Sequence, residues 1–164
     1  MYPLRPQPSA RLRFRAVVAE DIGRLTDLRT DPTVRQFLGG MLPVDEARRR
    51  AERLVGAPDH VVVDAAGEFV GLLSVTQRHR WGWEVSYEIA ATMWGQGLAQ
   101  EAVGAVVAHV QRTAPGEDVV AVTQTANARS LRLLAVLGFV ERDRFDEFGA
   151  EQVLLALPAA TTSR

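Results

Sequence analysis

The alternation of apolar and polar positions predicts a strand and two helices in the first third of the chain. Over residues 11–16, apolar side chains alternate with arginines, which is the period of a strand with one face in water. Over residues 22–28, apolar positions recur at helical spacing. This helix should end before Asp31-Pro32, because proline disfavours helical geometry in the residue before it. A helix is also predicted over residues 46–55.

From His60 onward the pattern changes to short apolar runs separated by turn residues, which favours strands joined as an antiparallel meander. The elements expected here are strands over 61–63, 69–75 and 83–90, a helix over 97–112, a strand over 119–123, a helix over 128–137 and two strands within 139–157. This order places helices on both faces of a mixed sheet. The fold class predicted is therefore α/β, in a layered α+β arrangement.

One domain accounts for the length of the chain. A sequence of 164 residues that is 47% hydrophobic can bury roughly two-thirds of the surface that its unfolded form exposes. No internal repeat or second boundary is visible, so residues 11–158 are expected to form a single domain. The proline-rich residues 1–10 are expected to form a flexible arm, and residues 159–164 a frayed tail.

Composition and charge exclude several classes of function. The net charge of -1 gives no field that would attract nucleic acid or an anionic membrane. The chain has no cysteine and no lysine, which removes thiolate nucleophiles, Schiff-base chemistry and a Walker-type phosphate loop. Its three histidines lack metal-ligand spacing, so no metal is expected. No segment approaches the ~18 consecutive apolar residues of a membrane span, so a cytoplasmic protein is expected.

The most informative segment is Trp94-Gly95-Gln96-Gly97-Leu98-Ala99, where a predicted strand runs through two glycines into a helix. Glycines let the backbone turn sharply and approach a ligand, and the N–H groups at a helix start point the same way. An anion such as a pyrophosphate fits this geometry. A dinucleotide-binding domain is disfavoured because the third glycine of that fingerprint is missing.

A second motif follows about thirty residues later, where Asn127 and Ser130 open a helix that ends at Gly138-Phe139. It resembles the closing signature of the GNAT superfamily of N-acetyltransferases. The glycine segment is similar to that superfamily's acetyl-CoA loop in its RimJ/RimL-like branch. The resemblance covers nearly the whole chain. It implies a mostly antiparallel sheet of about seven strands, splayed between the fourth and fifth to admit the pantetheine arm.

The resemblance also implies roles for individual residues. Ser130 would protonate or hydrogen-bond the departing thiolate, because Leu134 stands where many relatives have a tyrosine acid. The alternative for Ser130 is a helix-capping serine. Trp94 stands where many relatives have arginine or glutamine. The residues implied to bind acetyl-CoA are Ile89, Ala90, Ala91, Gly95, Gln96, Gly97, Leu98, Ala99, Asn127 and Ser130.

The reaction needs a base, since a primary amine with a pKa of about 10 must lose a proton before it attacks a thioester. Glu84 is the first candidate, because two neighbouring tryptophans could desolvate it and so raise its basicity. Glu88 lies on the same strand face and His79 is a competing base, while Tyr87, on the opposite face, is expected in the core. A water held by a carboxylate is a further option.

The sequence therefore predicts an acetyl-CoA-dependent N-acetyltransferase that acetylates a primary amine directly, in a ternary complex and without a metal. The acceptor would be a protein N-terminus or a small-molecule amine, with no nucleic-acid or membrane partner, and a homodimer is left open. The alternative is a sensor or scaffold that binds acyl-CoA without turnover. The identity of the acceptor is not readable from the residues.

Overall fold

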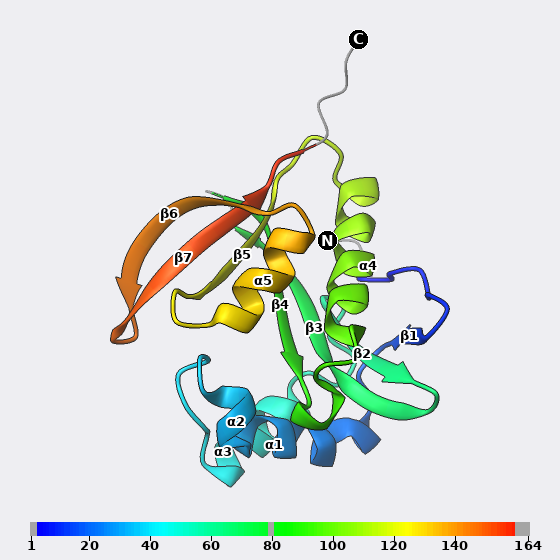
Figure 1. The fold of residues 1–164 in the computed structure, drawn as a ribbon. Coiled ribbons are helices and arrows are strands. Elements are labelled where there is room, and N and C mark those ends of the chain that lie inside the picture. Colours follow the sequence, from blue (N-terminus) through cyan, green and yellow to red (C-terminus); the bar gives the residue numbers. More distant parts are fainter. Residues whose placement is uncertain (1–2, 79–80, 160–164) are drawn as a thin grey trace.

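The computed structural model describes residues 3–78 and 81–159 and shows a seven-stranded sheet flanked by helices (Figure 1). The strand order is β1-β2-β3-β4-β5-β7-β6. The strands are β1 (Leu12–Arg15), β2 (His60–Ala65), β3 (Glu68–Arg78), β4 (Gly82–Ile89), β5 (Val119–Gln124), β6 (Val140–Glu147) and β7 (Ala150–Leu157). The helices are α1 (Ile22–Thr30), α2 (Pro32–Arg35), α3 (Val44–Glu52), α4 (Leu98–Thr113) and α5 (Ala128–Val136).

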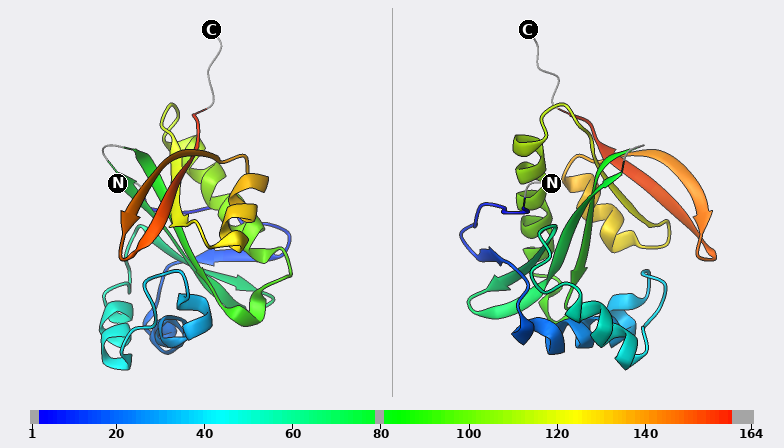
Figure 2. Two further views of the ribbon diagram at one scale, coloured as in Figure 1. Left: turned by 60° about the vertical axis from the view of Figure 1, so that its left-hand side comes forward. Right: turned by 180° about the vertical axis from the view of Figure 1, so that it is seen from behind.

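Alternation along the central strands builds two apolar layers, one on each face of the sheet. Val62 and Leu72 pack with residues of α1 and α3, whereas Val61 and Leu73 pack with α4 and α5. Figure 2 shows α1, α2 and α3 grouped together at one end of the molecule. The prediction of a layered α/β fold with helices on both faces is confirmed. None of the described helices combines the length and apolarity needed to cross a membrane.

The sheet is antiparallel except where β4 meets β5. These two strands are parallel and pair through Trp83 with Val119 and Glu84 with Val120. After Glu84, β4 continues to Ile89 against β3, while β5 continues to Gln124 against β7. The strands thus diverge, and the splay expected between the fourth and fifth strands is present.

The short helix α2 was not predicted. The preceding helix α1 ends at Thr30, as the Asp31-Pro32 sequence indicated. The Asp31 carboxylate then accepts hydrogen bonds from the N–H groups of Thr33 and Val34, so the same dipeptide also begins a new helix with proline in its first turn. Helix α3 spans Val44–Glu52, earlier at both ends than the predicted 46–55.

Two residues of the predicted N-terminal arm, Leu4 and Pro6, are buried, while most of its other described residues are exposed. Leu4 is buried in the core, and its N–H donates to the carbonyl of Pro58 at 2.7 Å. A single leucine among prolines has no periodicity, so its burial left no signal in the sequence. At the other end, Ala159 N–H donates to the Asp118 carboxylate at 2.9 Å, and the rest of the predicted tail lies outside the described residues.

Gly71 lies where β3 and β4 approach closely. A Cβ at this position would stand 2.2 Å from the carbonyl oxygen of Glu88. We expect Gly71→Ala to lower the free energy of unfolding by ~1–3 kcal/mol, because backbone must move to admit the methyl group. Urea denaturation measures this change. The matched control is Gly23→Ala on an exposed face of α1, where a Cβ meets nothing within 4 Å and stability should stay level or rise.

Candidate functional site

A cavity of about 300 Å³ occupies the region where β4 and β5 diverge. Residues 85–89 of β4 form one wall, and Val122 and Thr123 of β5 lie opposite. The segment 33–38, which includes part of α2, closes one side, and the start of α5 with Trp94 and Ala99 closes the other. The cavity therefore reaches from the helices of one sheet face to those of the other.

The glycine segment forms the predicted turn at the start of α4. Gly95 and Gly97 have φ angles of +76° and +75°, a left-handed conformation that side chains other than glycine rarely adopt. Gly97 is the residue that precedes the helix, and a Cβ at Gly95 would meet nothing within 4 Å. The first N–H groups of the sixteen-residue helix α4 thus follow a turn that faces open space at Gly95, and the Arg11 guanidinium lies 3.5 Å from where a Cβ of Gly97 would stand; the helix start and this positive charge both favour an anion.

Arg11 fastens this loop to the start of β1. Its guanidinium donates to the carbonyl of Gln96 at 2.9 Å and pairs with the Glu101 carboxylate at 2.6 Å. Ser9 also donates to Glu101. The hydrogen bonds from Ser9 and Arg11 hold the pKa of Glu101 below its usual value, so this acid in the first turn of α4 stays ionised. The loop conformation is therefore fixed by residues about 85 positions away.

The end of β4 presents main-chain groups toward the gap. Ala90 N–H donates to the carbonyl of Val70 on β3, so alternation along the ladder turns the main-chain groups of Ile89 away from β3. The Ile89 carbonyl accepts a hydrogen bond from the Trp94 indole at 3.0 Å. Of the three residues predicted here, Ile89 lines the cavity, while Ala90 and Ala91 pack toward the α1–α3 layer.

Ser130 is buried and its hydroxyl lies 2.5 Å from the phenol of Tyr87. Burial raises the pKa of Tyr87, so the phenol remains protonated at neutral pH. The cap of α5 is Asn127, whose side-chain oxygen accepts from Ser130 N–H at 3.2 Å and whose amide donates to Thr123. The Tyr87 ring packs against the core, as expected, but its hydroxyl lines the cavity with Ser130.

Leu134, one turn after Ser130, is fully buried in the core. Position 134 therefore brings no hydroxyl group to the cavity. Tyr87, on β4, brings one instead. Sequence reasoning missed the pair because Tyr87 and Ser130 are 43 residues apart.

The two candidate carboxylates lie in different places. Glu88 lines the cavity, whereas Glu84 is absent from the lining formed by the described residues. Glu84 lies at the paired beginning of β4 and accepts a hydrogen bond from Arg78 at 2.6 Å. His79, the competing base, lies outside the described residues.

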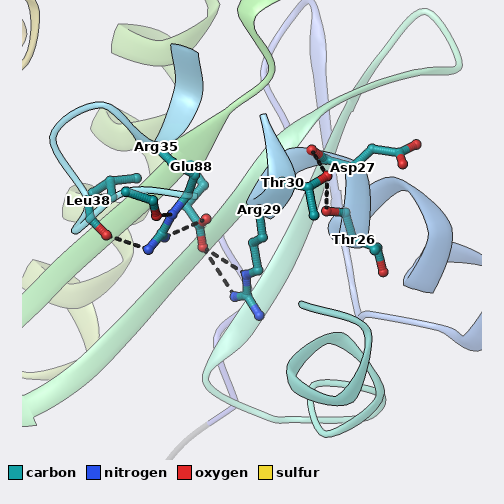
Figure 3. A network of polar contacts seen from close by, with 8 residues as sticks. Thr26, Asp27, Arg29, Thr30, Arg35, Leu38 and Glu88 are labelled. Atoms are coloured by element: carbon teal, nitrogen blue, oxygen red, sulfur yellow. Dashed lines mark hydrogen bonds and ion pairs between the residues drawn. The ribbon is translucent and has the colours of Figure 1, made fainter. Parts of the chain in front are cut away.

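Glu88 is held between two arginines, as Figure 3 shows. One carboxylate oxygen accepts from Arg29 at 3.2 Å, and the other accepts from Arg35 at 3.5 Å. Arg35 also donates to the carbonyls of Gly40 and Leu38, which secures the loop after α2. The side chains of Arg29, Arg35 and Glu88 are 10%, 13% and 17% exposed, so this charged group is largely shielded from water.

Arg129 brings a further positive charge to the opposite side of the cavity. Its guanidinium carbon lies 3.6 Å from the centre of the Trp94 ring, in cation–π contact. Among residues 3–78 and 81–159, no three acidic or histidine side chains cluster closely enough to hold a metal ion.

A family model described as "Acetyltransferase (GNAT) domain" matches residues 11–140. No curated protein matches the chain in sequence.

Solved structures share the fold over almost the whole chain. A GNAT-family acetyltransferase from Bacillus anthracis has a TM-score of 0.82 at 17% identity, covering 95% of this chain and 98% of that one. A GNAT-family acetyltransferase from Bordetella pertussis has a TM-score of 0.74 at 25% identity, covering 93% and 98%. The RimL ribosomal L7/L12 α-N-protein acetyltransferase, solved with coenzyme A, has a TM-score of 0.78 at 16% identity, covering 93% and 97%.

Proposed function

The chain belongs to the GNAT acetyltransferase family, and from this premise we propose that it transfers the acetyl group of acetyl-CoA directly to a primary amine, in a ternary complex. The observation that carries the proposal is the cavity between the diverging strands. It is lined by a carboxylate and a hydroxyl pair suited to proton transfer, and by Trp94 and Ala99, which lie at the two ends of a glycine loop suited to a pyrophosphate. The absence of cysteine excludes a thioester-linked acyl-enzyme.

The coenzyme would enter from the α4 and α5 side. The pyrophosphate would be bound by main-chain N–H groups of residues 95–99, with Arg129 close enough to add a positive charge. The pantetheine arm would follow the end of β4 over residues 89–91, where the Ile89 carbonyl has a second lone pair beside the one that accepts from the Trp94 indole. Asn127 lines the cavity and would hold the same arm.

The acceptor would approach from the α1 and α2 side. Alternation along β4 places Glu88 on that face and Tyr87 on the other, so the acceptor and the leaving thiolate have separate groups. The amine nitrogen would add to the acetyl carbon to form a tetrahedral intermediate, and the carbon–sulfur bond would break when this intermediate collapses. We assign the removal of the amine proton to Glu88, directly or through water, in place of the Glu84 favoured by the sequence.

The departing thiolate would be met by Ser130. If the Tyr87 phenol donates to Ser130, the serine proton is left to point at the sulfur. A thiol has a pKa of about 8.5, so its thiolate is a weak base that needs only a neutral hydrogen-bond donor at neutral pH. The main-chain N–H of Ile89 would stabilise the oxyanion of the tetrahedral intermediate.

Ser130→Ala is expected to lower kcat by about 10- to 100-fold with little change in acetyl-CoA affinity, because one hydrogen bond to the transition state is lost. Tyr87→Phe should give a smaller loss of the same kind, since the serine proton remains but is no longer oriented. Asn127→Ala should instead raise the KM for acetyl-CoA. Steady-state kinetics with calorimetric coenzyme titration separates these effects. Parallel losses of affinity at unchanged saturated turnover would reduce Ser130 to a binding or capping residue.

The proposed function is tested by release of CoA thiol, corrected for hydrolysis, against peptides, polyamines, amino acids and aminoglycosides. Acetylation of at least one amine, with mass spectrometry of the product, supports the enzyme. Acetyl-CoA binding without turnover across the whole panel would support a coenzyme-binding sensor or scaffold instead.

A further inference from the structure

The acceptor side of the cavity carries an unusual grouping of charge. Glu88 is paired with both Arg29 and Arg35, so three largely shielded charged groups leave one net positive charge. The two that line the cavity are Glu88 and Arg35, with 3.5 Å between a carboxylate oxygen and a guanidinium nitrogen. The cavity thus presents a negative and a positive group side by side (Figure 3).

Arg35 has capacity for a further partner. A guanidinium has five N–H donors, and three of them are used within the described residues, for Glu88, Gly40 and Leu38. These bonds hold the guanidinium in place, which lowers the entropy that a ligand would lose on binding it. A planar guanidinium fixed at the wall of a shielded cavity is well suited to a carboxylate.

We propose that the acceptor bears a carboxylate close to its reacting amine, as an amino acid does. The ammonium group would face Glu88 and the carboxylate would face Arg35, which matches the order of charges in the cavity. This inference rests on the proposed function. The cavity holds about 300 Å³ in total, part of it needed by the acetylated arm, and this room suits a small acceptor.

A polyamine fits this site poorly. It brings two or more positive charges toward the shielded guanidinium groups of Arg35 and Arg29, against the single carboxylate of Glu88 among the described lining residues of the cavity. Like charges in a shielded site oppose binding. The same positive groups favour the neutral form of an acceptor amine, which is the form that attacks the thioester.

The inference is tested with matched acceptors in the CoA-release assay. Each amino acid is compared with its carboxamide and with spermidine. The ammonium group of the carboxamide has the lower pKa, so a larger fraction of its amine is neutral and able to attack the thioester. Without a carboxylate-binding group in the site, the carboxamide should therefore be the better acceptor. We expect the kcat/KM of the free acid to be at least about tenfold higher than that of the carboxamide, because a tenfold change corresponds to the free energy of one strong contact. Equal or better use of the carboxamide or of spermidine would overturn the inference while leaving the proposed function standing.

Arg35→Gln provides the second arm. We expect it to raise the KM for the free acid about tenfold or more and to leave the KM for the carboxamide near its original value, while Arg35→Lys keeps part of the preference. Because Arg35 also secures the loop after α2, a purely structural role would raise both KM values together, and that result would reject the assignment. Arg48→Gln, on the exposed part of α3, controls for the loss of one charge. Failure of every amine to react would reject the proposed function itself.

Discussion

Replacing Gly97 by glutamate is expected to raise the Kd for acetyl-CoA at least about 100-fold, a loss near 2.7 kcal/mol, while the domain stays folded. Gly97 precedes α4 with a φ of +75°, and the space beside it is where main-chain N–H groups would meet the pyrophosphate. A carboxylate there both fills the approach and repels the phosphates. It costs roughly 1–2 kcal/mol of backbone strain, which a negative charge at a helix start partly offsets.

The control for this variant is Gly149→Glu, in the turn between β6 and β7 at the other end of the strand order. Gly149 has a φ of +74° and a Cβ there would meet nothing within 4 Å, so the substitution adds the same charge and a similar strain outside the loop and the cavity lining. Calorimetry and circular dichroism on both variants give the answer. Unchanged coenzyme affinity in a folded Gly97→Glu protein would refute the assignment of residues 95–99 to the pyrophosphate.

Glu88→Gln is expected to lower kcat by about 100-fold or more at saturating acceptor, because an amide cannot take the proton of the amine. Glutamine keeps the shape of the side chain, and its single carbonyl oxygen can still accept a hydrogen bond from Arg29 or from Arg35, while its amide group faces the other guanidinium. Acetyl-CoA affinity should stay near the original value, since the coenzyme would bind along the other face. Thermal unfolding of the variant measures how much stability the domain loses when Arg29 and Arg35 no longer have a carboxylate partner.

Glu84→Gln serves as the matched variant on the same strand face. Glu84 is paired with Arg78 at the start of β4, so its loss should leave turnover within a few-fold of the original. The reverse pattern, with Glu84→Gln inactive and Glu88→Gln active, would restore the sequence-based choice of base and remove Glu88 from the reaction.

The periodic elements of the fold could be predicted from the sequence because burial on one face imposes a pattern on the residues. The strands around Val62 and the long helix after Gly97 follow such patterns closely. Helix α2 is four residues long and has no period, so only its Asp31 cap could have revealed it. This omission mattered, since α2 carries Arg35 to the cavity.

The glycine loop was recognisable because its function depends on main-chain geometry, which the order of glycines records. The side-chain partners were not recognisable in the same way. Tyr87 meets Ser130, and Glu88 meets Arg29, through contacts between residues 43 and 59 positions apart. In the sequence, Glu84 and Glu88 lie on the same face of one predicted strand and carry the same charge. Only the point at which β4 leaves β5 distinguishes them.

The divergence of β4 from β5 also divides the sheet, though not the apolar core packed against it, into two units. One contains β1 to β4 and the other contains β5, β7 and β6, and the ladder between them consists of two residue pairs. A local opening along this seam would expose the amides of both inner strands to hydrogen exchange while each unit kept its own ladder. A ligand that bridges the units stabilises the closed form by mass action. Under the proposed function, abundant acetyl-CoA would stabilise the closed form of the β4–β5 seam. When the coenzyme is depleted, this seam would be the first part of the domain to open.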